Sequence, residues 1–146
     1  MLVLDTDLLT VIQKQSGELY RRLNDRLQHV FETETVAITI ISLEEQMRGW
    51  LAYLNRTTAR PNGKSLVVGY KRLHELFLDF ELRTVLDFDE DAYEQYFDLK
   101  GSKLRAGTMD LRIAAIVLVH GATLLTRNMR DFEQIPGLKV EDWTKD

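Results

Sequence analysis

At 146 residues, the chain has the length of one ordinary domain and can bury a sizeable core without disulfides or structural zinc. Its composition, with 45% apolar and 29% charged residues, excludes a disordered or fibrous protein. The net charge of −4 argues against nucleic-acid binding by bulk electrostatics, although basic residues close to a site can still follow a phosphate backbone.

The sequence also bears on the location of the protein. The chain contains no cysteine, which agrees with a reducing cytoplasm. Its first residues lack the basic segment and apolar run of a signal peptide, and no stretch approaches the roughly 18 apolar residues of a membrane span. We therefore expect a cytoplasmic protein with no membrane partner.

The first part of the chain alternates short apolar runs with amphipathic segments. Residues 2–4 form a continuous apolar run, typical of a strand buried on both faces. Leucine and valine then recur at spacings of four and three over residues 19–30, which predicts a helix with one apolar stripe. Residues 36–41 are rich in β-branched side chains and predict a second strand. Ser42 is predicted to cap the next helix, with Glu45 at the capping-box position and an apolar stripe over residues 43–54.

The second part continues this alternation. The polar residues 55–64 predict a loop that joins two helices of a hairpin, the second helix covering residues 66–80. Asp89 is predicted to cap a further helix, and residues 111–120 are so apolar that their helix should be central and buried. Short strands are predicted at residues 84–88, 122–125 and 138–143.

This alternation is typical of an α/β protein. We predict a three-layer α/β/α sandwich around a parallel sheet of four or five strands. Because no internal repeat or domain boundary interrupts the sequence, we expect a single domain over residues 1–146.

Acidic residues recur where the predicted strands end or the next helices begin. These residues are Asp5, Glu45, Asp110 and Asp131. The carboxyl ends of parallel strands share one edge of a sheet, so we expect the four carboxylates to converge there. They would repel one another unless divalent cations lay between them, and oxygen ligands without cysteine or paired histidine favour Mg²⁺ or Mn²⁺. A metal-dependent nuclease is the leading hypothesis.

Each carboxylate also has a structural explanation. Asp5 and Asp110 stand where helix caps are common, and Asp131 follows Asn128, which is a typical turn residue. Glu44 and Glu45 both suit the positive end of a helix dipole, and periodicity does not choose between them. None of these explanations predicts that all four sites recur at the same edge of one sheet.

Other catalytic motifs are absent from the sequence. The three histidines, His29, His74 and His120, are far apart and are assigned structural roles. The phosphate-binding loop, the dinucleotide fingerprint and the serine-hydrolase elbow do not occur. Nucleotide triphosphates, dinucleotides and serine-hydrolase chemistry therefore lack their main supports.

Four segments resemble one known family. Residues 1–7 resemble its start, except that Asp7 stands where the family usually has Asn, and residues 41–49 resemble its segment T-x-x-E-L-x-x-G. Residues 107–115 and 126–138 match its patterns G-x-x-D-x-x-I-A-A and T-x-N-x-x-D-F-x-x-I-P-G-L. The chain thus resembles the PIN-domain ribonucleases, especially the VapC toxins of bacterial toxin–antitoxin pairs. Aligning Ser42 and Gly49 with the family's motif selects Glu45 rather than Glu44.

The resemblance implies a PIN-like fold and Mg²⁺- or Mn²⁺-dependent cleavage of RNA. It implies inhibition by a cognate antitoxin that occupies the site, and we also expect a homodimer. Asp5, Glu45, Asp110 and Asp131 would bind the metal and carry catalysis, with Thr6, Asp7 and Asn128 as auxiliary groups. Basic residues that flank the last two acids are candidates for RNA binding: Lys103, Arg105, Arg112, Arg127 and Arg130.

Two other functions remain open. Asp5 and Asp7 imitate the D-x-D start of haloacid-dehalogenase-type phosphatases, in which Asp5 would be the nucleophile and Asp7 the acid–base. Alternatively, the protein is a non-catalytic module that binds a partner helix.

The hairpin offers a surface for a partner. Trp50, Tyr53 and Leu54 extend one apolar stripe, and the next helix carries Leu73, Leu76 and Phe77. These residues either form a groove for an antitoxin helix or pack against one another, and the sequence leaves both possibilities open.

Overall fold

The computed structural model of the protein describes residues 1–59 and 63–146, and for residues 58 and 59 it describes only the backbone. Its centre is a five-stranded, wholly parallel sheet in the order β3-β2-β1-β4-β5. The strands are β1 (Leu2–Leu4), β2 (Val36–Thr39), β3 (Thr84–Leu86), β4 (Thr123–Leu125) and β5 (Lys139–Glu141). The helices are α1 (Thr6–Lys14), α2 (Glu18–Val30), α3 (Ile40–Ala59), α4 (Gly63–Glu81), α5 (Glu90–Gly101), α6 (Thr108–Val119) and α7 (Met129–Phe132).

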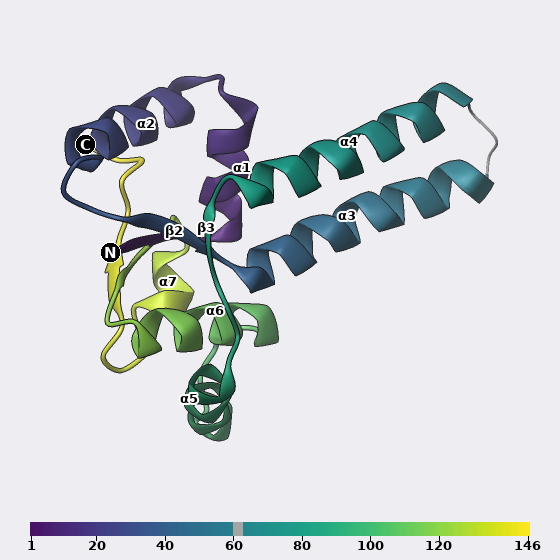
Figure 1. Cartoon of the computed structure of the whole chain (residues 1–146). Helices are drawn as coiled ribbons and strands as arrows, with labels where there is room; N and C mark the ends of the chain where they lie inside the picture. Colours follow the sequence, from purple (N-terminus) through teal and green to yellow (C-terminus); the bar gives the residue numbers. More distant parts are fainter. Residues whose placement is uncertain (60–62) are drawn as a thin grey trace.

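Helices cover both faces of the sheet, as Figure 1 shows. One core joins the sheet to α5, α6 and α7, and its centre is the fully buried segment 113–117 of α6. The other core joins the opposite face to α1, α2 and the base of α4. The predicted three-layer sandwich and the central position of the apolar helix are therefore confirmed, since alternate strand residues point to opposite faces.

The strand β1 lies in the middle of the sheet and sets its register. Val3 lies opposite Ala37 of β2 on one side and opposite Leu124 of β4 on the other. Because all the strands run in one direction, the residues that follow β1, β2 and β4 lie along a single edge. That edge carries Asp5, the start of α3, and the segment from Thr126 to α7.

The boundary between β2 and α3 differs from the prediction. The strand ends at Thr39, and the β-branched residues Ile40 and Ile41 already belong to the helix. Ser42 therefore lies inside the first turn and is not the cap; its backbone N–H donates to Thr39 Oγ1 at 3.4 Å. The paired segments of β1 and β3 are each three residues long, so a longer β2 would have no partner for its ladder.

Other boundaries also differ from the predictions. Helix α1 and the short α7 were not predicted, and the strands predicted at 84–88, 122–125 and 138–143 are each shorter. Asp89 caps α5 as predicted, because its Oδ1 accepts from the Ala92 N–H at 2.9 Å. His120 lies at the C-terminal cap of α6, which agrees with its structural role. None of the helices in the described segments has the length and apolarity needed to cross a membrane.

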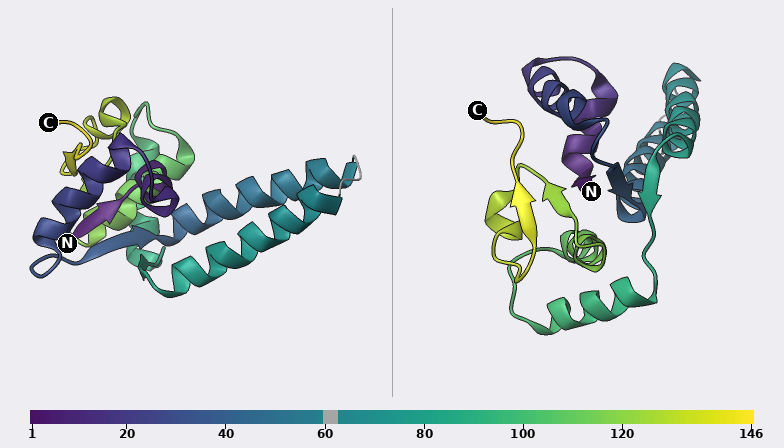
Figure 2. Two further views of the ribbon diagram at one scale, coloured as in Figure 1. Left: turned by 90° about the horizontal axis from the view of Figure 1, so that it is seen from above. Right: turned by 60° about the vertical axis from the view of Figure 1, so that its left-hand side comes forward.

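The predicted loop at residues 55–64 is mostly helical. Helix α3 continues to Ala59 and α4 begins at Gly63, whereas residues 60–62 lie outside the described residues. The two helices project beyond the sheet as a long hairpin, which the left view of Figure 2 shows. Polar residues are tolerated in this part because much of the hairpin surface faces solvent.

The two helices of the hairpin pack closely at Gly69. A Cβ atom on this buried residue would lie 2.5 Å from Leu54 Cδ2 and 3.1 Å from Leu54 Cγ. We expect Gly69→Ala to lower the free energy of unfolding by about 1–3 kcal/mol, since the added methyl overpacks the contact. Gly49→Ala is the matched control, because Gly49 lies within α3 with open space around it and should gain up to about 1 kcal/mol. Urea unfolding of both variants tests this, and equal stabilisation would contradict the close contact.

Candidate active site

Asp5 links the end of β1 to the start of α1. Its Oδ1 caps α1 by accepting from the Leu8 N–H at 2.8 Å, and its Oδ2 accepts a short hydrogen bond from the Thr126 hydroxyl beyond β4. The residue is only 6% exposed. Burial raises the pKa of Asp5 to about 6, against the lowering effect of both hydrogen bonds, and the charges of Asp7 and Asp110 raise it further. Capping and a place in the acidic site are thus compatible for this residue.

Glu45 lies one turn into α3 and faces α1. Its Oε1 accepts from the Thr6 hydroxyl at 2.7 Å, and the same hydroxyl lies 2.8 Å from Ser42 Oγ. Glu44 instead pairs with Arg48 at 2.7 Å, one turn along α3. The structure therefore brings Glu45 toward the other carboxylates, a choice that helical periodicity left open.

Asp110 lies in the first turn of α6, within the helix rather than before it. The helix begins at Thr108 and its cap is Gly107, so Asp110 is not a capping residue. Burial raises the pKa of Asp110, and the nearby charges of Glu45 and Asp131 raise it further. Within the described part of the chain, this half-buried carboxylate has no hydrogen-bond donor or cationic partner.

Asp131 lies in α7 and is held from two sides. Its Oδ2 accepts from Asn128 Nδ2 at 3.2 Å, and its Oδ1 lies 3.3 Å from Arg105 Nε. The backbone N–H of Asn128 in turn donates to Thr126 Oγ1 at 2.9 Å. Asn128 thus connects Asp131 to the hydroxyl that also binds Asp5.

The four carboxylates interact electrostatically through Asp110. Its charge acts on Asp5, and the charges of Glu45 and Asp131 act on it. Even so, the described residues contain no group of three or more His, Cys, Asp or Glu side chains already arranged to hold one metal ion. The donor set consists of carboxylate oxygens, and Asp110 lacks a compensating charge, so its chemistry fits a hard divalent cation.

The basic candidates for RNA binding differ in their contacts. Arg105 and Arg127 each pair with an acid of the site, Asp131 and Asp7 respectively. Arg112 stacks over the Tyr96 ring at 5.3 Å. Lys103 and Arg130 are exposed side chains.

Two hydroxyl contacts of the site were missed in the sequence. Thr126 is fully buried and binds both Asp5 and the Asn128 backbone. The sequence pattern over residues 126–138 includes this threonine but does not predict its contacts. Ser42 was assigned to a cap and instead contacts Thr6. A buried hydroxyl that directly follows an apolar run is the signal that could have found Thr126, because a buried polar group requires a partner.

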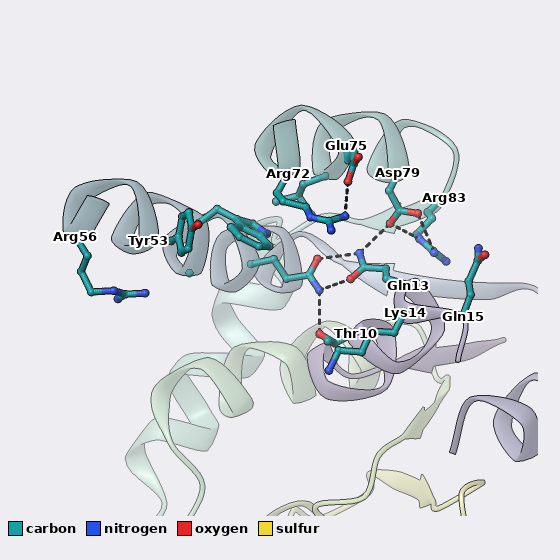
Figure 3. A pocket seen from close by; sticks show the side chains of 14 residues that line it. Thr10, Gln13, Lys14, Gln15, Tyr53, Arg56, Arg72, Glu75, Asp79 and Arg83 are labelled. Carbon is teal, nitrogen blue, oxygen red and sulfur yellow. Dashed lines mark hydrogen bonds and ion pairs between the residues drawn. The ribbon is translucent and has the colours of Figure 1, made fainter. Parts of the chain in front are cut away.

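A groove of about 880 Å³ lies beside this site, between α1, α3 and α4 (Figure 3). Its floor is an amide pair in which Gln13 and Gln46 donate to each other at 3.0 and 2.7 Å. Gln46 also donates to Thr10 Oγ1 at 3.1 Å, and Gln13 donates to Asp79 Oδ2 at 2.9 Å. Gln46 directly follows Glu45, so α3 carries both a residue of the groove and a carboxylate of the acidic site.

The groove only partly matches the predicted apolar surface. Trp50 and Tyr53 line it, with ring centroids 5.5 Å apart in an edge-to-face arrangement. Leu54 and Leu76 are buried, and Leu54 packs against Gly69 within the hairpin, as the packing alternative predicts. Phe77 is 59% exposed. Helix α1 was not predicted to form a wall of the groove.

Comparisons with known proteins place this arrangement in context. No protein-family model matches the chain. The chain is 28% identical to Ribonuclease VapC2 of Rickettsia felis over 145 residues, which cover 98% of each protein. Its structure matches VapBC from Salmonella typhimurium bound to DNA with a TM-score of 0.67 and 26% identity, over 97% of each chain. Both sequence and fold are therefore similar to those of VapC proteins over nearly the whole chain.

Two further comparisons also find VapC proteins. The tRNA(fMet)-specific endonuclease VapC of Salmonella typhimurium is 36% identical over 63 residues, which cover 40% of this chain and 48% of that protein. VapBC-1 from nontypeable Haemophilus influenzae shares the fold with a TM-score of 0.73 at 23% identity, over 99% of this chain and 98% of that one. The expected PIN-like fold is confirmed. These similarities do not favour the phosphatase or the non-catalytic module.

Proposed function

We propose that residues 1–146 form a single PIN domain that cleaves RNA internally, with a divalent metal ion, as the toxin of a toxin–antitoxin pair. The observation that carries this proposal is the electrostatic coupling of Asp110 to Asp5, Glu45 and Asp131, four carboxylates from separate segments of the chain. RNA as the substrate is supported by the VapC relatives, which are named as ribonucleases. A cognate antitoxin is supported by structural neighbours that are VapBC complexes.

Asp5, Glu45, Asp110 and Asp131 would hold Mg²⁺ or Mn²⁺. A bound ion of this kind polarises a phosphoryl oxygen and activates water for attack on phosphorus. The chain's own hydroxyl and amide groups orient three of the four carboxylates: Thr126 binds Asp5, Thr6 binds Glu45 and Asn128 binds Asp131. Because water is the nucleophile in this proposal, we expect no covalent intermediate between enzyme and RNA.

Purified protein freed of any partner is expected to cut RNA only when Mg²⁺ or Mn²⁺ is present, because its acidic site offers only oxygen ligands. Cleavage of a labelled RNA is measured with each ion, with excess chelator, and after the ion is restored. The matched control is Glu44→Gln, which removes a charge beside Glu45 but outside the proposed ligand set and should cut like the parent. Undiminished cleavage in excess chelator would overturn the proposed metal dependence.

The groove between α1, α3 and α4 is the proposed docking site of the antitoxin. It has the aromatic wall of Trp50 and Tyr53, and its lining residue Gln46 is the sequence neighbour of Glu45. Arg72 and Arg83 at its edge pair with Glu75 and Asp79 respectively, which leaves a mixed polar rim around the apolar wall. An apolar centre with a polar rim is typical of protein interfaces.

Replacing Tyr53 or Trp50 by Ala is expected to weaken antitoxin binding by at least about tenfold, because buried aromatic anchors carry much of the energy of an interface. The partner tested is the protein encoded by the neighbouring reading frame, and the readouts are its affinity and its inhibition of RNA cleavage. Phe31→Ala is the control, since Phe31 is 72% exposed and does not line the groove. Thermal melts identify a variant that fails to fold. Unchanged affinity of both folded groove variants would place the antitoxin elsewhere.

The expected homodimer is also part of this proposal. Met47 and Leu51 are exposed on one side of α3, 38% and 50% respectively, and two copies of the chain could cover such surfaces. Light scattering on the isolated protein measures its mass in solution. A monomer at all accessible concentrations would remove the dimer from the proposal.

A further inference from the structure

Asp7 and Arg127 form the best-aligned ion pair at the rim of the acidic site. Arg127 Nε donates to Asp7 Oδ2 at 2.7 Å, and Arg127 Nη2 donates to Asp7 Oδ1 at 2.9 Å. Both carboxylate oxygens are therefore engaged by one guanidinium. The pair joins the first turn of α1 to the segment after β4, two parts of the chain that are 120 residues apart.

The guanidinium of Arg127 stands beside the carboxylates. The preceding residue, Thr126, donates its hydroxyl to Asp5 Oδ2. The hydrogen bonds to Asp7 raise the pKa of Arg127, and the charges of Asp7, Asp5 and Asp142 act in the same direction. Arg127 therefore contacts Asp7 and also feels the charge of Asp5, so a ligand bound by its guanidinium would lie near the proposed reaction site.

The Asp7 carboxylate can be replaced on Arg127 by another anion. The Arg127 and Asp7 side chains are 38% and 51% exposed, and ion pairs of such exposure contribute little net free energy. A guanidinium binds the oxygens of a phosphate in the same two-point fashion as those of a carboxylate. Loss of the pair with Asp7 would therefore cost little free energy when an RNA phosphate takes its place on Arg127.

The geometry points to Arg127 as a residue that binds a phosphate of the RNA. In the absence of RNA, Asp7 occupies its guanidinium, so Asp7 and the RNA backbone compete for this one group. This inference rests on the proposed function, because it deepens how the same site takes its substrate. Two other basic candidates lack this arrangement. Arg112 stacks on Tyr96, and Arg105 makes a single contact of 3.3 Å with Asp131.

A double-mutant cycle on RNA binding tests the competition. Asp7→Asn, Arg127→Ala and the double variant are made in the Asp110→Asn background with EDTA present, so that the RNA stays intact and binding is read without catalysis. The probe is a fluorescently labelled single-stranded RNA oligonucleotide, followed by anisotropy at several salt concentrations. Glu44→Gln is the matched control, since it also removes the charge of an acid paired with an arginine, at 2.7 Å.

We expect Asp7→Asn to tighten RNA binding about three- to tenfold and to steepen its salt dependence by about one phosphate contact. In the Arg127→Ala background the same change should alter affinity less than about twofold, like Glu44→Gln, because the released guanidinium is absent. Equal tightening with and without Arg127 would show a long-range charge effect and overturn the competition. Unchanged affinity in Arg127→Ala would overturn phosphate binding. If the parent protein still cuts RNA, neither of these two results contradicts the proposed ribonuclease function. A parent protein that neither binds nor cuts RNA would overturn both the proposed function and the role of Arg127.

Discussion

Replacing Asp110 by Asn is expected to slow RNA cleavage by at least about a hundredfold while the protein stays folded. The charge of Asp110 raises the pKa of Asp5, and the charges of Glu45 and Asp131 raise the pKa of Asp110. An amide of the same shape keeps the packing at the start of α6 but loses the charge that would bind a divalent ion. Because burial and like charges already raise the pKa of Asp110, removing its charge should not destabilise the fold.

Single-turnover cleavage and urea unfolding on the same preparation decide this prediction. Asp98→Asn is the matched control, since it makes the same chemical change at an exposed position of α5 and should leave cleavage unchanged. Full cleavage activity of Asp110→Asn would remove this residue from the proposed site. Collapse of the fold would show that its role is structural.

Asp5→Asn is expected to stabilise the metal-free protein at about pH 8 by about 1–3 kcal/mol. Burial raises the pKa of Asp5 from 3.8 to about 6 in the folded protein, so its ionised form is disfavoured there relative to the unfolded chain. Below about pH 4 the carboxyl is protonated in both states and the penalty is absent. The penalty grows as the pH rises from about 4 to about 6 and is complete above that range. Asn at this position keeps an oxygen that can cap α1.

Urea unfolding of Asp5→Asn and the parent protein in excess chelator, at about pH 8 and about pH 4, measures this difference. The stabilisation should shrink toward zero at the lower pH. Asp98→Asn should show no comparable dependence, since Asp98 is exposed. A variant that is less stable than the parent by the same amount at both pH values would contradict the penalty for burying the Asp5 charge.

The sequence predicted correctly those elements in which the local preference of the residues agrees with their place in the fold. Residues 2–4 are apolar and β-prone and lie at the centre of the sheet, whereas residues 113–117 are apolar on every side and are fully buried in α6. The acids at the ends of these elements could therefore be placed at one edge before any geometry was known. Parallel strands leave few other arrangements for them.

The failures share a physical cause, which is that tertiary contacts override local preference. Helix α1 contains four β-branched residues, which favour strands: Thr6, Thr10, Val11 and Ile12. The Asp5 cap and the burial of Leu8 and Leu9 nevertheless stabilise a helix there. Ile40 and Ile41 likewise favour a strand, but β2 is limited by its short neighbours.

The contacts of the site were also beyond local patterns. The bond from Thr126 to Asp5 depends on the pairing of Leu4 with Leu125, which brings together residues 121 positions apart. The choice of Glu45 over Glu44 depends on where α1 packs, since the Thr6 hydroxyl selects Glu45. Sequence periodicity predicts neither the bond from Thr126 to Asp5 nor the choice of Glu45. Only the resemblance to a family predicted the choice of Glu45.

Mn²⁺ binding to the purified, partner-free protein tests the central claim most directly, because that claim is that carboxylates from four separate segments form one metal site. Calorimetric titration is carried out on the parent protein, on Asp5→Asn, Glu45→Gln, Asp110→Asn and Asp131→Asn, and on the control Glu44→Gln. We expect the parent and the control to bind Mn²⁺ alike and each site variant to bind at least about tenfold more weakly. A parent protein that does not bind Mn²⁺, or site variants that bind it as tightly as the parent, would contradict the claim.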